Sequence, residues 1–383
     1  MSKKLRHTIL RVVTAAQSVG FFEGMIPDIE ALGYDVAVTA SPGPDLDRLA
    51  AAGERSLPEA MQRHISPLRD IVSLCRLIRL IRRERPIMVH SMTPKAGLLA
   101  MMAAALCRVP VRVHTFTGLV FPTARGITQR ILIITDRLTC RCATHIVPEG
   151  QGVLDDLRSF RITAKPMHVL GHGNVRGIDL DHYSRSPQVL ALAAPLRRPD
   201  AFTFIFIGRL VGDKGINELV RAFTKLHTLL PHTRLILVGP EERTLDPLQP
   251  DTICAINSCP AIEAVGHQAD VRPWLAAADA LAFPSYREGF PNVVIEAGAM
   301  SLPAIVTDIN GSREIITHGS NGLIIPPRSA DALFTAMHTL ATDADLTASL
   351  AANARPMIAS RFDRRYVTRC LIDYYRSILP GEH

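Results

Sequence analysis

The segment LAFPSYREGFPNVVIEAGAM, residues 281–300, predicts a strand end, a turn and a helix in immediate succession. The apolar run 281–283 has the composition of a buried strand. Gly289 and the prolines around it break that run, and 292–300 has the residue types of a helix. Pro291 stands near the first helical turn, where a missing N–H costs little. The pattern is typical of one strand–loop–helix step of an α/β domain.

Two carboxylates bracket this turn, because Glu288 precedes the predicted helix and Glu296 lies inside it. An N-terminal helical turn carries free N–H groups and a partial positive charge, which favour an anion. At about 1.5 Å per helical residue, the carboxylates would lie roughly 8–12 Å apart. That distance suits a sugar–diphosphate–ribose with hydroxyls held at each end. The spacing alone leaves open that both acids are solvated surface residues.

Composition restricts the class of protein. A chain of 383 residues exceeds the size of one growing core, and 47% apolar residues are ample for two domains. Only 5% of residues are aromatic, which argues against a base-stacking nucleic-acid surface. The seven cysteines include no C-x2-C pair, so we expect reduced thiols and neither a disulfide framework nor a zinc site.

Charge is unevenly distributed along the chain. Residues 1–185 carry 25 Lys and Arg against 16 Asp and Glu, whereas the remainder carries 18 against 20. A basic first half predicts an anionic partner there: a membrane surface, a pyrophosphate or a nucleic acid. The N-terminus lacks a signal-peptide pattern, and the apolar stretch 96–106 is too short to cross a bilayer. We therefore expect a cytoplasmic protein, either soluble or peripheral at the inner face of the plasma membrane.

The first half begins with strand, helix and strand signals at 8–15, 21–32 and 35–39, which predict a βαβ unit in a parallel sheet. The first turn contains only Gly20, not G-x-G-x-x-G, so a dehydrogenase is disfavoured. Gly20 is either a backbone requirement of the turn or a place where a ligand approaches.

The most basic segment is 66–85, which predicts a helix. Apolar residues at helical spacing form one predicted face: Ile71, Leu74, Cys75, Ile78 and Ile81. Arginines lie mostly opposite: Arg76, Arg79, Arg82, Arg83 and Arg85. Two interpretations stay open, a covering helix with a solvated basic face or a helix that lies against anionic lipid headgroups.

Further strands are predicted at 87–90 and 111–113, which would place His90 and His114 at strand ends. Ligands bind at the carboxyl ends of parallel strands, so two histidines there favour a site over isolated structural roles. In the second half, Gly208, Arg209 and Lys214 lie between a predicted strand at 201–207 and a helix at 216–229, which suits a diphosphate clamp. The next strand ends at Gly239.

Three motifs resemble those of the family-4 retaining glycosyltransferases of the GT-B fold. They are FPSYREGFPNVVIEAGAMSLPAIVTD at 283–308, G-R-L-x-x-x-K-G at 208–215, and HSMTPKAGLLAMMAAALCRVPVRVHTFTG at 90–118. The last resembles the acceptor domain of capsule and O-antigen enzymes. Those often have a second histidine where this chain has Thr117. The resemblance covers nearly the whole chain and is weak in 119–165 and 240–262.

The resemblance implies two doubly wound Rossmann-like domains that face each other across a cleft. We expect an acceptor-binding domain at 1–184 with a returning C-terminal helix at 362–383, and a nucleotide-sugar domain at 185–361. The Glu288–Glu296 pair would hold the donor sugar and the ribose. The expected catalytic residues are Glu288, Arg209, Lys214 and His114. The expected donor-binding residues are Glu296, Gly289, Phe290, Pro291, Asn292, Gly208, Gly20, Gly239 and His267. The expected acceptor-binding residues are Thr93, Lys95 and His90.

The predicted activity is transfer of a sugar, with retention, from a UDP-linked hexose or N-acetylhexosamine to a polyprenyl-diphosphate-linked saccharide. No D-x-D follows a strand, and the Arg209–Lys214 pair can replace a metal, so we expect no metal ion and no cofactor besides the nucleotide sugar. We expect no nucleic-acid partner, and the Arg76–Arg85 region is the candidate membrane contact. The alternatives are a UDP-sugar 2-epimerase of the same architecture or a basic nucleic-acid-binding protein.

Overall fold

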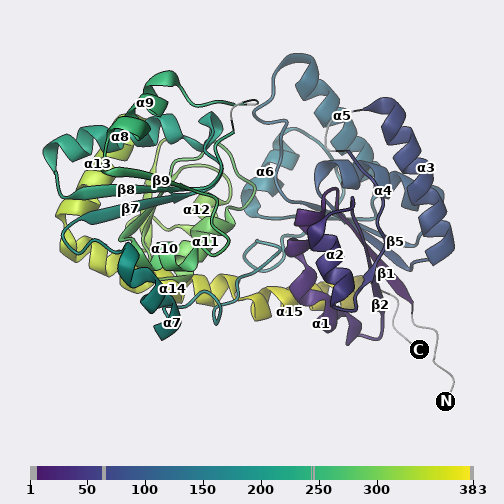
Figure 1. Ribbon diagram of the computed structural model, residues 1–383. Helices are drawn as coiled ribbons and strands as arrows, with labels where there is room; N and C mark the ends of the chain where they lie inside the picture. Colours follow the sequence, from purple (N-terminus) through teal and green to yellow (C-terminus); the bar gives the residue numbers. More distant parts are fainter. Residues whose placement is uncertain (1–6, 63–65, 243, 245, 380–383) are drawn as a thin grey trace. The chain divides into compact units, whose positions relative to one another are not determined.

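The computed structural model describes residues 7–62, 66–242, 244 and 246–379. The chain forms two compact units, one made of residues 1–177 and 365–383 and the other of residues 178–364 (Figure 1). The sequence placed the corresponding boundaries at 184/185 and 361/362. Each unit has its own parallel sheet and its own hydrophobic core.

The sheet of the first unit has the order β3-β2-β1-β4-β5-β6, and every described pair of neighbours is parallel. Its strands are β1 (Thr8–Val12), β2 (Asp35–Thr39), β3 (Arg55–Ser56), β4 (Met88–Met92), β5 (Val111–Phe116) and β6 (His145–Pro148). The chain winds outward from β1 in one direction and then from β4 in the other. This is a doubly wound sheet, whose ligand crevice forms where the winding direction reverses.

Helices cover both faces of this sheet. They are η1 (Ala16–Phe21), η2 (Glu23–Met25), α1 (Ile26–Glu30), α2 (Pro44–Ala51), α3 (Pro67–Glu84), α4 (Pro94–Leu106), α5 (Gly126–Cys142), α6 (Gln151–Ser159) and α15 (Arg364–Ile378). One core contains side chains of α1, α2 and α15, and the other contains side chains of α3, α4, α5 and α6. The helix predicted at 21–32 is broken: the end of η1 and the 3₁₀ turn η2 precede a short α1.

The second unit repeats the plan with the order β12-β11-β10-β7-β8-β9. Its strands are β7 (Phe202–Ile207), β8 (Thr233–Val238), β9 (Ile262–Gly266), β10 (Ala280–Phe283), β11 (Ala304–Thr307) and β12 (Gly322–Ile325). Its helices are α7 (Pro187–Ala193), η3 (Ala194–Leu196), η4 (Gly212–Lys214), α8 (Ile216–Leu229), α9 (Pro250–Ser258), α10 (Arg272–Ala277), α11 (Asn292–Ala299), α12 (Ser312–Ile315), α13 (Ala330–Thr342) and α14 (Ala344–Phe362). Two doubly wound α/β units confirm the predicted fold class.

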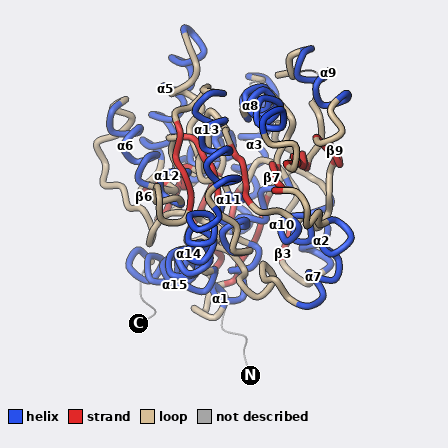
Figure 2. Tube along the Cα trace, turned by 90° about the vertical axis from the view of Figure 1, so that its left-hand side faces the viewer, coloured by secondary structure: helices blue, strands red, loops and turns tan. Residues whose placement is uncertain are grey.

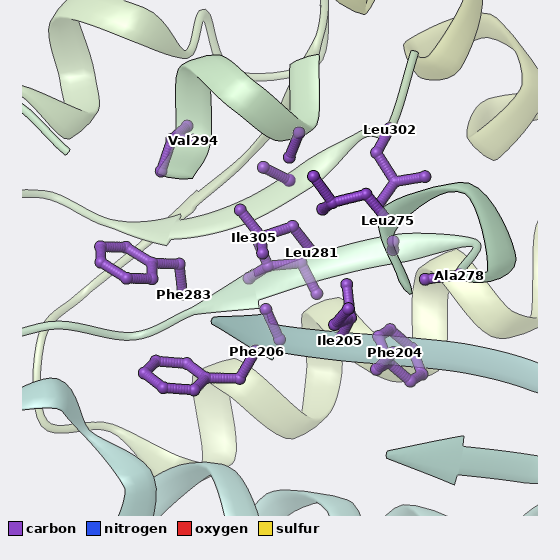
Figure 3. Packing of buried hydrophobic residues seen from close by; sticks show 14 of the residues in the cluster. Phe204, Ile205, Phe206, Leu275, Ala278, Leu281, Phe283, Val294, Leu302 and Ile305 are labelled. Carbon is purple, nitrogen blue, oxygen red and sulfur yellow. The ribbon is translucent and has the colours of Figure 1, made fainter. Parts of the chain in front are cut away.

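The core of the second unit forms where the central strands meet helices on both sides. Figure 3 shows Phe206, Leu281 and Ile305 on three adjacent strands, with Val294 of α11 above them. Helices α8 and α13 pack together, as do α11 and α14 (Figure 2). Because the strands are buried on both faces, they consist of nearly continuous apolar runs, which is why the sequence located them well.

Only part of the predicted apolar face of α3 turns inward: Ile81 is buried, and Leu74 and Ile78 pack against the core. The structure buries Ser73, Leu77, Leu80 and Ile81, and it exposes Ile71 and Cys75. The Ser73 hydroxyl donates to the Ala60 carbonyl at 2.9 Å, which holds that face against the protein. Apolar residues occur around most of this helix, so periodicity alone could not select its inner side. Among the described residues, no helix is both long enough and apolar enough to cross a membrane.

A buried polar cluster joins α15 to the sheet of the first unit. The Arg11 guanidinium is 2% exposed, and its Nη1 donates to the Tyr375 hydroxyl at 2.5 Å. The same hydroxyl lies 2.6 Å from His90 Nδ1, and His90 Nε2 lies 2.8 Å from Thr115 Oγ1. Arg11 also lies over the Phe22 ring, 4.3 Å from its centroid. A buried cation with so few acceptors depends strongly on each one.

Replacing Tyr375 by Phe should therefore lower the free energy of unfolding by about 2–3 kcal/mol, because Arg11 loses its hydroxyl acceptor in a dry environment. Urea unfolding of the purified protein measures this. The neighbouring Tyr374 is a matched control, since its hydroxyl is buried and makes no hydrogen bond. Tyr374→Phe should be neutral or slightly stabilising, and equal losses in both variants would contradict the role of the cluster.

Asp136 lies on α5, and burial raises the pKa of its carboxyl to about 7. The raised pKa means that the folded protein holds this proton more tightly than the unfolded chain. Stability should thus fall as pH rises from about 4 to about 7, and the loss should remain complete above that range.

Asp136→Asn should remove this penalty and stabilise the protein at pH 8 by on the order of 3 kcal/mol, with little effect at pH 4. Thermal unfolding across this pH range is the measurement. Asp200→Asn, at an exposed loop position, is the control. A gain that is the same at both pH values would show that Asp136 is not protonated by folding.

Candidate active site

In the second unit, the predicted donor residues follow the carboxyl ends of four strands. Arg209 and Lys214 follow β7, Gly239 follows β8, His267 follows β9, and the Glu288 loop follows β10. Carboxyl ends of parallel strands meet at one edge of a sheet, so these loops share that edge. The predicted donor residues other than Gly20 therefore lie on neighbouring loops or helix starts of one unit, whereas Gly20 lies in the first unit.

Two glycines let these loops approach one another closely. Gly239 has φ +139°, and a Cβ there would lie 1.9 Å from the Gly208 carbonyl oxygen. Gly215 has φ +73°, and a Cβ there would lie 2.2 Å from the Pro284 carbonyl oxygen. Neither position has room for a side chain, and positive φ disfavours one independently. The Arg209 loop is thus pressed against the end of β8, and the Lys214 loop against the turn after β10.

Lys214 and Glu288, which the sequence assigned to different parts of the donor, are paired with each other. The Lys214 ammonium donates a hydrogen bond to Glu288 Oε1. The Ser285 hydroxyl donates to the same oxygen at 2.8 Å, and the ammonium lies 5.7 Å from the centroid of the Phe283 ring. The two side chains are only 18% and 16% exposed. A half-buried cation and carboxylate are therefore held together beside the start of α11.

Arg209 is the more exposed of the two predicted cations, since 52% of its side chain is exposed. Its Nη1 donates to Glu242 Oε2 at 2.5 Å. The sequence did not single out Glu242, because it lies in the stretch where the motifs are weakest. An anion that reaches Arg209 would compete with this carboxylate, and an exposed pair of this kind is weak in water.

Helix α11 begins at Asn292, and Pro291 precedes it as the N-cap. The Phe290 ring is 6% exposed and packs edge-to-face with Phe362 at 5.5 Å between centroids. Phe290 and Pro291 are thus buried, and only their backbone remains for a ligand, whereas Asn292 and Glu296 keep partial exposure. Glu296 lies one turn into the helix, as predicted.

Gly289 is partly exposed, and the loop after β11 approaches it. A Cβ on Gly311 would lie 2.4 Å from the Gly289 carbonyl oxygen. His267 is exposed just after β9. Its neighbour Gly266 has φ +67° with open space around a Cβ, so that turn needs glycine for its backbone conformation and not for packing.

Supporting residues that the sequence did not identify hold the Lys214 loop in place. Asp246 Oδ2 accepts from the Asp213 N–H at 2.5 Å, and the Tyr286 N–H donates to the Asp213 carbonyl at 2.8 Å. Ser285 Oγ, besides its bond to Glu288, contacts the Arg287 carbonyl at 3.2 Å. Ser285 lies in the quoted motif, and the sequence offers no reason to single it out. Asp246 has no local signal, because its role depends on a loop 33 positions away.

In the first unit, both predicted histidines lie inside strands, not at strand ends as expected. His90 is in β4 and His114 is in β5. The strands continue through these polar residues because their side chains are hydrogen-bonded. Ser91 Oγ lies 2.9 Å from His114 Nδ1 on the next strand, and the two His90 nitrogens contact Thr115 of β5 and Tyr375 of α15. The two rings are 2% and 1% exposed.

Burial lowers the pKa of His114 to about 3 and that of His90 well below its ordinary value. Both rings are therefore neutral at physiological pH. His114 is also fixed by α4, since a Cβ on Gly97 would lie 2.3 Å from His114 Cε1. The contacts of His90 make it a core residue. Both of its ring nitrogens are already hydrogen-bonded within the protein, so neither is available to bind an acceptor substrate. His114 Nε2 lies in the same buried setting.

Thr93 and Lys95 stand at the start of α4, as the sequence placed them. Thr93 has φ +72°, a strained value for a non-glycine residue, and its Oγ1 lies 2.8 Å from Thr14 Oγ1. Lys95 Nζ donates to both carboxylate oxygens of Asp70, at 2.7 and 2.8 Å. Its side chain is 10% exposed, so an acceptor phosphate would have to compete with Asp70. Gly20 lies in η1, where a Cβ would meet nothing within 4 Å.

Comparison with known proteins agrees with these two units. Residues 22–173 match the family model described as "Glycosyl transferase 4-like domain", and residues 201–343 match "Glycosyl transferases group 1". The capsular polysaccharide biosynthesis glycosyltransferase CapM of Staphylococcus aureus is 27% identical over 97% of both chains. The UDP-Gal:alpha-D-GlcNAc-diphosphoundecaprenol alpha-1,3-galactosyltransferase of Escherichia coli is 25% identical over 84% of this chain and 83% of that protein.

Among solved structures, Anabaena Alr3699/HepE in complex with UDP and glucose superposes with a TM-score of 0.81 at 19% identity. It covers 97% of this chain and 100% of that one, and at this identity it supports the fold alone. The two family models together span most of both units, and they include the Arg209–Lys214 loop, the Glu288–Glu296 pair and the β4–α4 segment. The chain is a glycosyltransferase of the group-1, family-4 type with the GT-B fold.

Proposed function

We propose that this enzyme transfers a hexose or N-acetylhexosamine from a UDP-sugar to a hydroxyl of a polyprenyl-diphosphate-linked saccharide, in synthesis of a surface polysaccharide. The observation that supports this most strongly is the Lys214–Glu288 pair beside the start of α11. The named substrates of the Escherichia coli galactosyltransferase and the capsular role of CapM supply the substrate class. The UDP and glucose of the HepE complex are consistent with the donor.

The proposed chemistry depends on the leaving group. As the glycosidic bond breaks, negative charge grows on the departing diphosphate, so preorganised positive groups lower the barrier. Lys214 and Arg209 would supply the cations, and the N–H groups at the start of α11 would add their dipoles. Glu288 would then exchange its ammonium partner for hydroxyls of the donor sugar. Glu296 would bind the ribose hydroxyls, and we propose retention of anomeric configuration on the family resemblance.

Metal independence belongs to the same proposal, because the two cations Arg209 and Lys214 can neutralise a diphosphate without Mg²⁺. Turnover should therefore be the same with and without EDTA. A loss of activity in EDTA that returns with Mg²⁺ or Mn²⁺ would show that the cations of the protein are insufficient.

The test of donor binding is a screen of UDP-, GDP- and TDP-sugars by calorimetry and by donor hydrolysis, on wild type and Glu296→Ala. Wild type should bind one class of UDP-sugar, and the variant should bind it at least tenfold more weakly because the ribose hydroxyls lose their acceptor. Asp251→Ala, at an exposed position on α9, is the control. Absence of binding by any nucleotide sugar would overturn the assignment. Release of an epimerised UDP-sugar without an acceptor would indicate the epimerase instead.

A lipid-linked acceptor requires the enzyme to work at a membrane surface. We propose peripheral contact with an anionic membrane, at the inner face of the plasma membrane, through the basic part of α3. The arginines of this part that are exposed are Arg76, Arg79, Arg82, Arg83 and Arg85. Each basic residue near an anionic surface contributes about 1 kcal/mol, so several together give reversible binding.

A further inference from the structure

Helix α5 of the first unit is barely covered by the protein. Of its 17 residues only Thr139 and Cys140 are buried. Ile127, Ile131 and Ile134 are 77%, 41% and 62% exposed. These three isoleucines follow one another at spacings of four and three, so they form one outward stripe along the helix. An uncovered stripe of β-branched apolar residues is rare on a soluble surface.

Arginines border this stripe. Arg130, Arg137 and Arg141 are all exposed, and their spacings of seven and four place them along one side of the helix beside the isoleucines. The single acidic residue of α5 is Asp136, which belongs to the inner side. The outer face of α5 is therefore apolar along its centre and positively charged along one border, which is the pattern of a helix that lies in a membrane interface.

Helix α3 has a second surface of the same kind. Leu68, Ile71 and Val72, in its first two turns, are 81%, 58% and 49% exposed. The arginines of the following turns, Arg76 to Arg83, occupy the outer side of the same helix. Its two acids are both paired: Asp70 binds Lys95, and the Glu84 carboxylate, 6% exposed, binds Arg55 and Arg83.

Both helices belong to one layer of one unit. α3 and α5 each pack against α4, and all three contribute to the same core on one face of the sheet. The Lys95–Asp70 ion pair joins the start of α4 to the start of α3. Between them, α4 presents half-buried Leu98 and Met102. Exposed apolar residues of α3 and α5 therefore flank the half-buried ones of α4 within one layer.

We propose that the outer faces of α5 and of the first half of α3 form a bilayer-docking surface. The isoleucines of α5 and the apolar residues of α3 enter the boundary between headgroups and acyl chains, and the flanking arginines bind anionic phospholipid headgroups. The absence of exposed acids on either helix favours an anionic bilayer over a second copy of this net-positive chain. This proposal deepens the proposed function. It rests on that function in one respect: a lipid-linked acceptor gives the enzyme a reason to bind a membrane.

The two helices contribute differently to membrane binding. The basic segment 76–85 alone offers only electrostatic attraction, which moderate salt screens. The isoleucine stripe of α5 adds an apolar contribution that salt does not weaken. Binding to anionic vesicles should therefore decline with added salt and yet persist at a measurable level.

The experiment is flotation of the full-length protein with vesicles of phosphatidylcholine mixed with phosphatidylglycerol, and with phosphatidylcholine alone. Wild type should float with the mixed vesicles. The variant Ile127→Ser/Ile131→Ser/Ile134→Ser should bind them at least tenfold more weakly, since three apolar side chains no longer leave water. The variant Arg130→Gln/Arg137→Gln/Arg141→Gln should lose about fivefold per arginine and most of the preference for anionic vesicles.

Matched controls come from the second unit, where Leu192 and Leu229 are 53% and 59% exposed. Leu192→Ser/Leu229→Ser should leave flotation unchanged. All altered positions are exposed, so the variants should unfold at the temperature of the wild type. Failure of wild type to float, or equal flotation by the isoleucine variant, would overturn the proposal. A dimer in sedimentation that the isoleucine variant abolishes would identify a second copy as the occupant and would overturn it as well.

Donor binding in solution separates this inference from the proposed function. The isoleucine variant should bind the UDP-sugar as tightly as wild type, because α5 lies outside the residues assigned to the donor. If vesicles bind and no nucleotide sugar does, the docking surface stands and the proposed function fails. If the donor binds and vesicles do not, the reverse holds.

Discussion

Lys214→Ala should lower kcat/KM for sugar transfer by roughly 10²–10³-fold, the effect expected when a preorganised charge on a leaving group is removed. Lys214 is only 18% exposed and is held by Glu288 and by the Phe283 ring, so its ammonium is fixed in a partly dry setting. The substitution also leaves the Glu288 carboxylate without its cation. Steady-state kinetics with a UDP-sugar and a short diphosphate-linked acceptor would measure the loss.

Lys225→Ala is the matched control, because Lys225 is an exposed lysine of α8 whose partner Asp331 is 90% exposed. It should change kcat/KM by less than about twofold, as exposed ion pairs contribute little. A double-mutant cycle of Lys214→Ala with Glu288→Gln should show losses that do not add, because each side chain positions the other. Losses that add fully would mean that the two residues act independently of their pairing.

Gly239→Ala should lower the free energy of unfolding by about 4 kcal/mol or more and should also abolish donor binding. A Cβ at this position would lie 1.9 Å from the Gly208 carbonyl oxygen, and both atoms belong to backbone that cannot rotate away. The ends of β7 and β8 would have to separate, which would displace Arg209. Chemical denaturation and calorimetric titration with the UDP-sugar would measure the two effects.

Gly266→Ala isolates the backbone part of this effect. Gly266 also has positive φ, at +67°, but a Cβ there would meet nothing within 4 Å. The substitution should cost only about 1 kcal/mol, from the strained conformation alone. Equal losses at the two glycines would show that positive φ, and not the contact between loops, makes Gly239 necessary.

The parts of the fold that could be predicted from sequence are those that depend on residues close together in the chain. Buried parallel strands are continuous apolar runs, as at β7 and β8, and the turns after them carry glycine and proline. The loops of Arg209, Lys214 and Glu288 were located for the same reason, since each follows a recognisable strand end; their role in donor binding stays a prediction. The extent of β4 and β5 was not predictable, because hydrogen bonds between side chains carry those strands through histidine, serine and threonine.

Hydrogen bonds and ion pairs between residues far apart in the chain could not be predicted from local patterns either. His90 is paired with Tyr375, 285 positions later, and Lys214 with Glu288, 74 positions later. Helix α3 has apolar residues on its inner and outer sides, so the inner side was settled by what packs there and not by periodicity. The isoleucine spacing of α5 would also suit a helix buried in the core. Only the exposure of these side chains in the folded unit shows that they form an outer surface.

The sequence by itself determined two doubly wound α/β domains and the positions of the loops that follow their strands, because strand, turn and helix signals act over a few residues. Only the tertiary structure decided which charges are paired, which histidines are buried and neutral, and which apolar face of the first unit stays in contact with water. Those properties depend on burial and on neighbours distant in the chain, and both arise only when the units have folded.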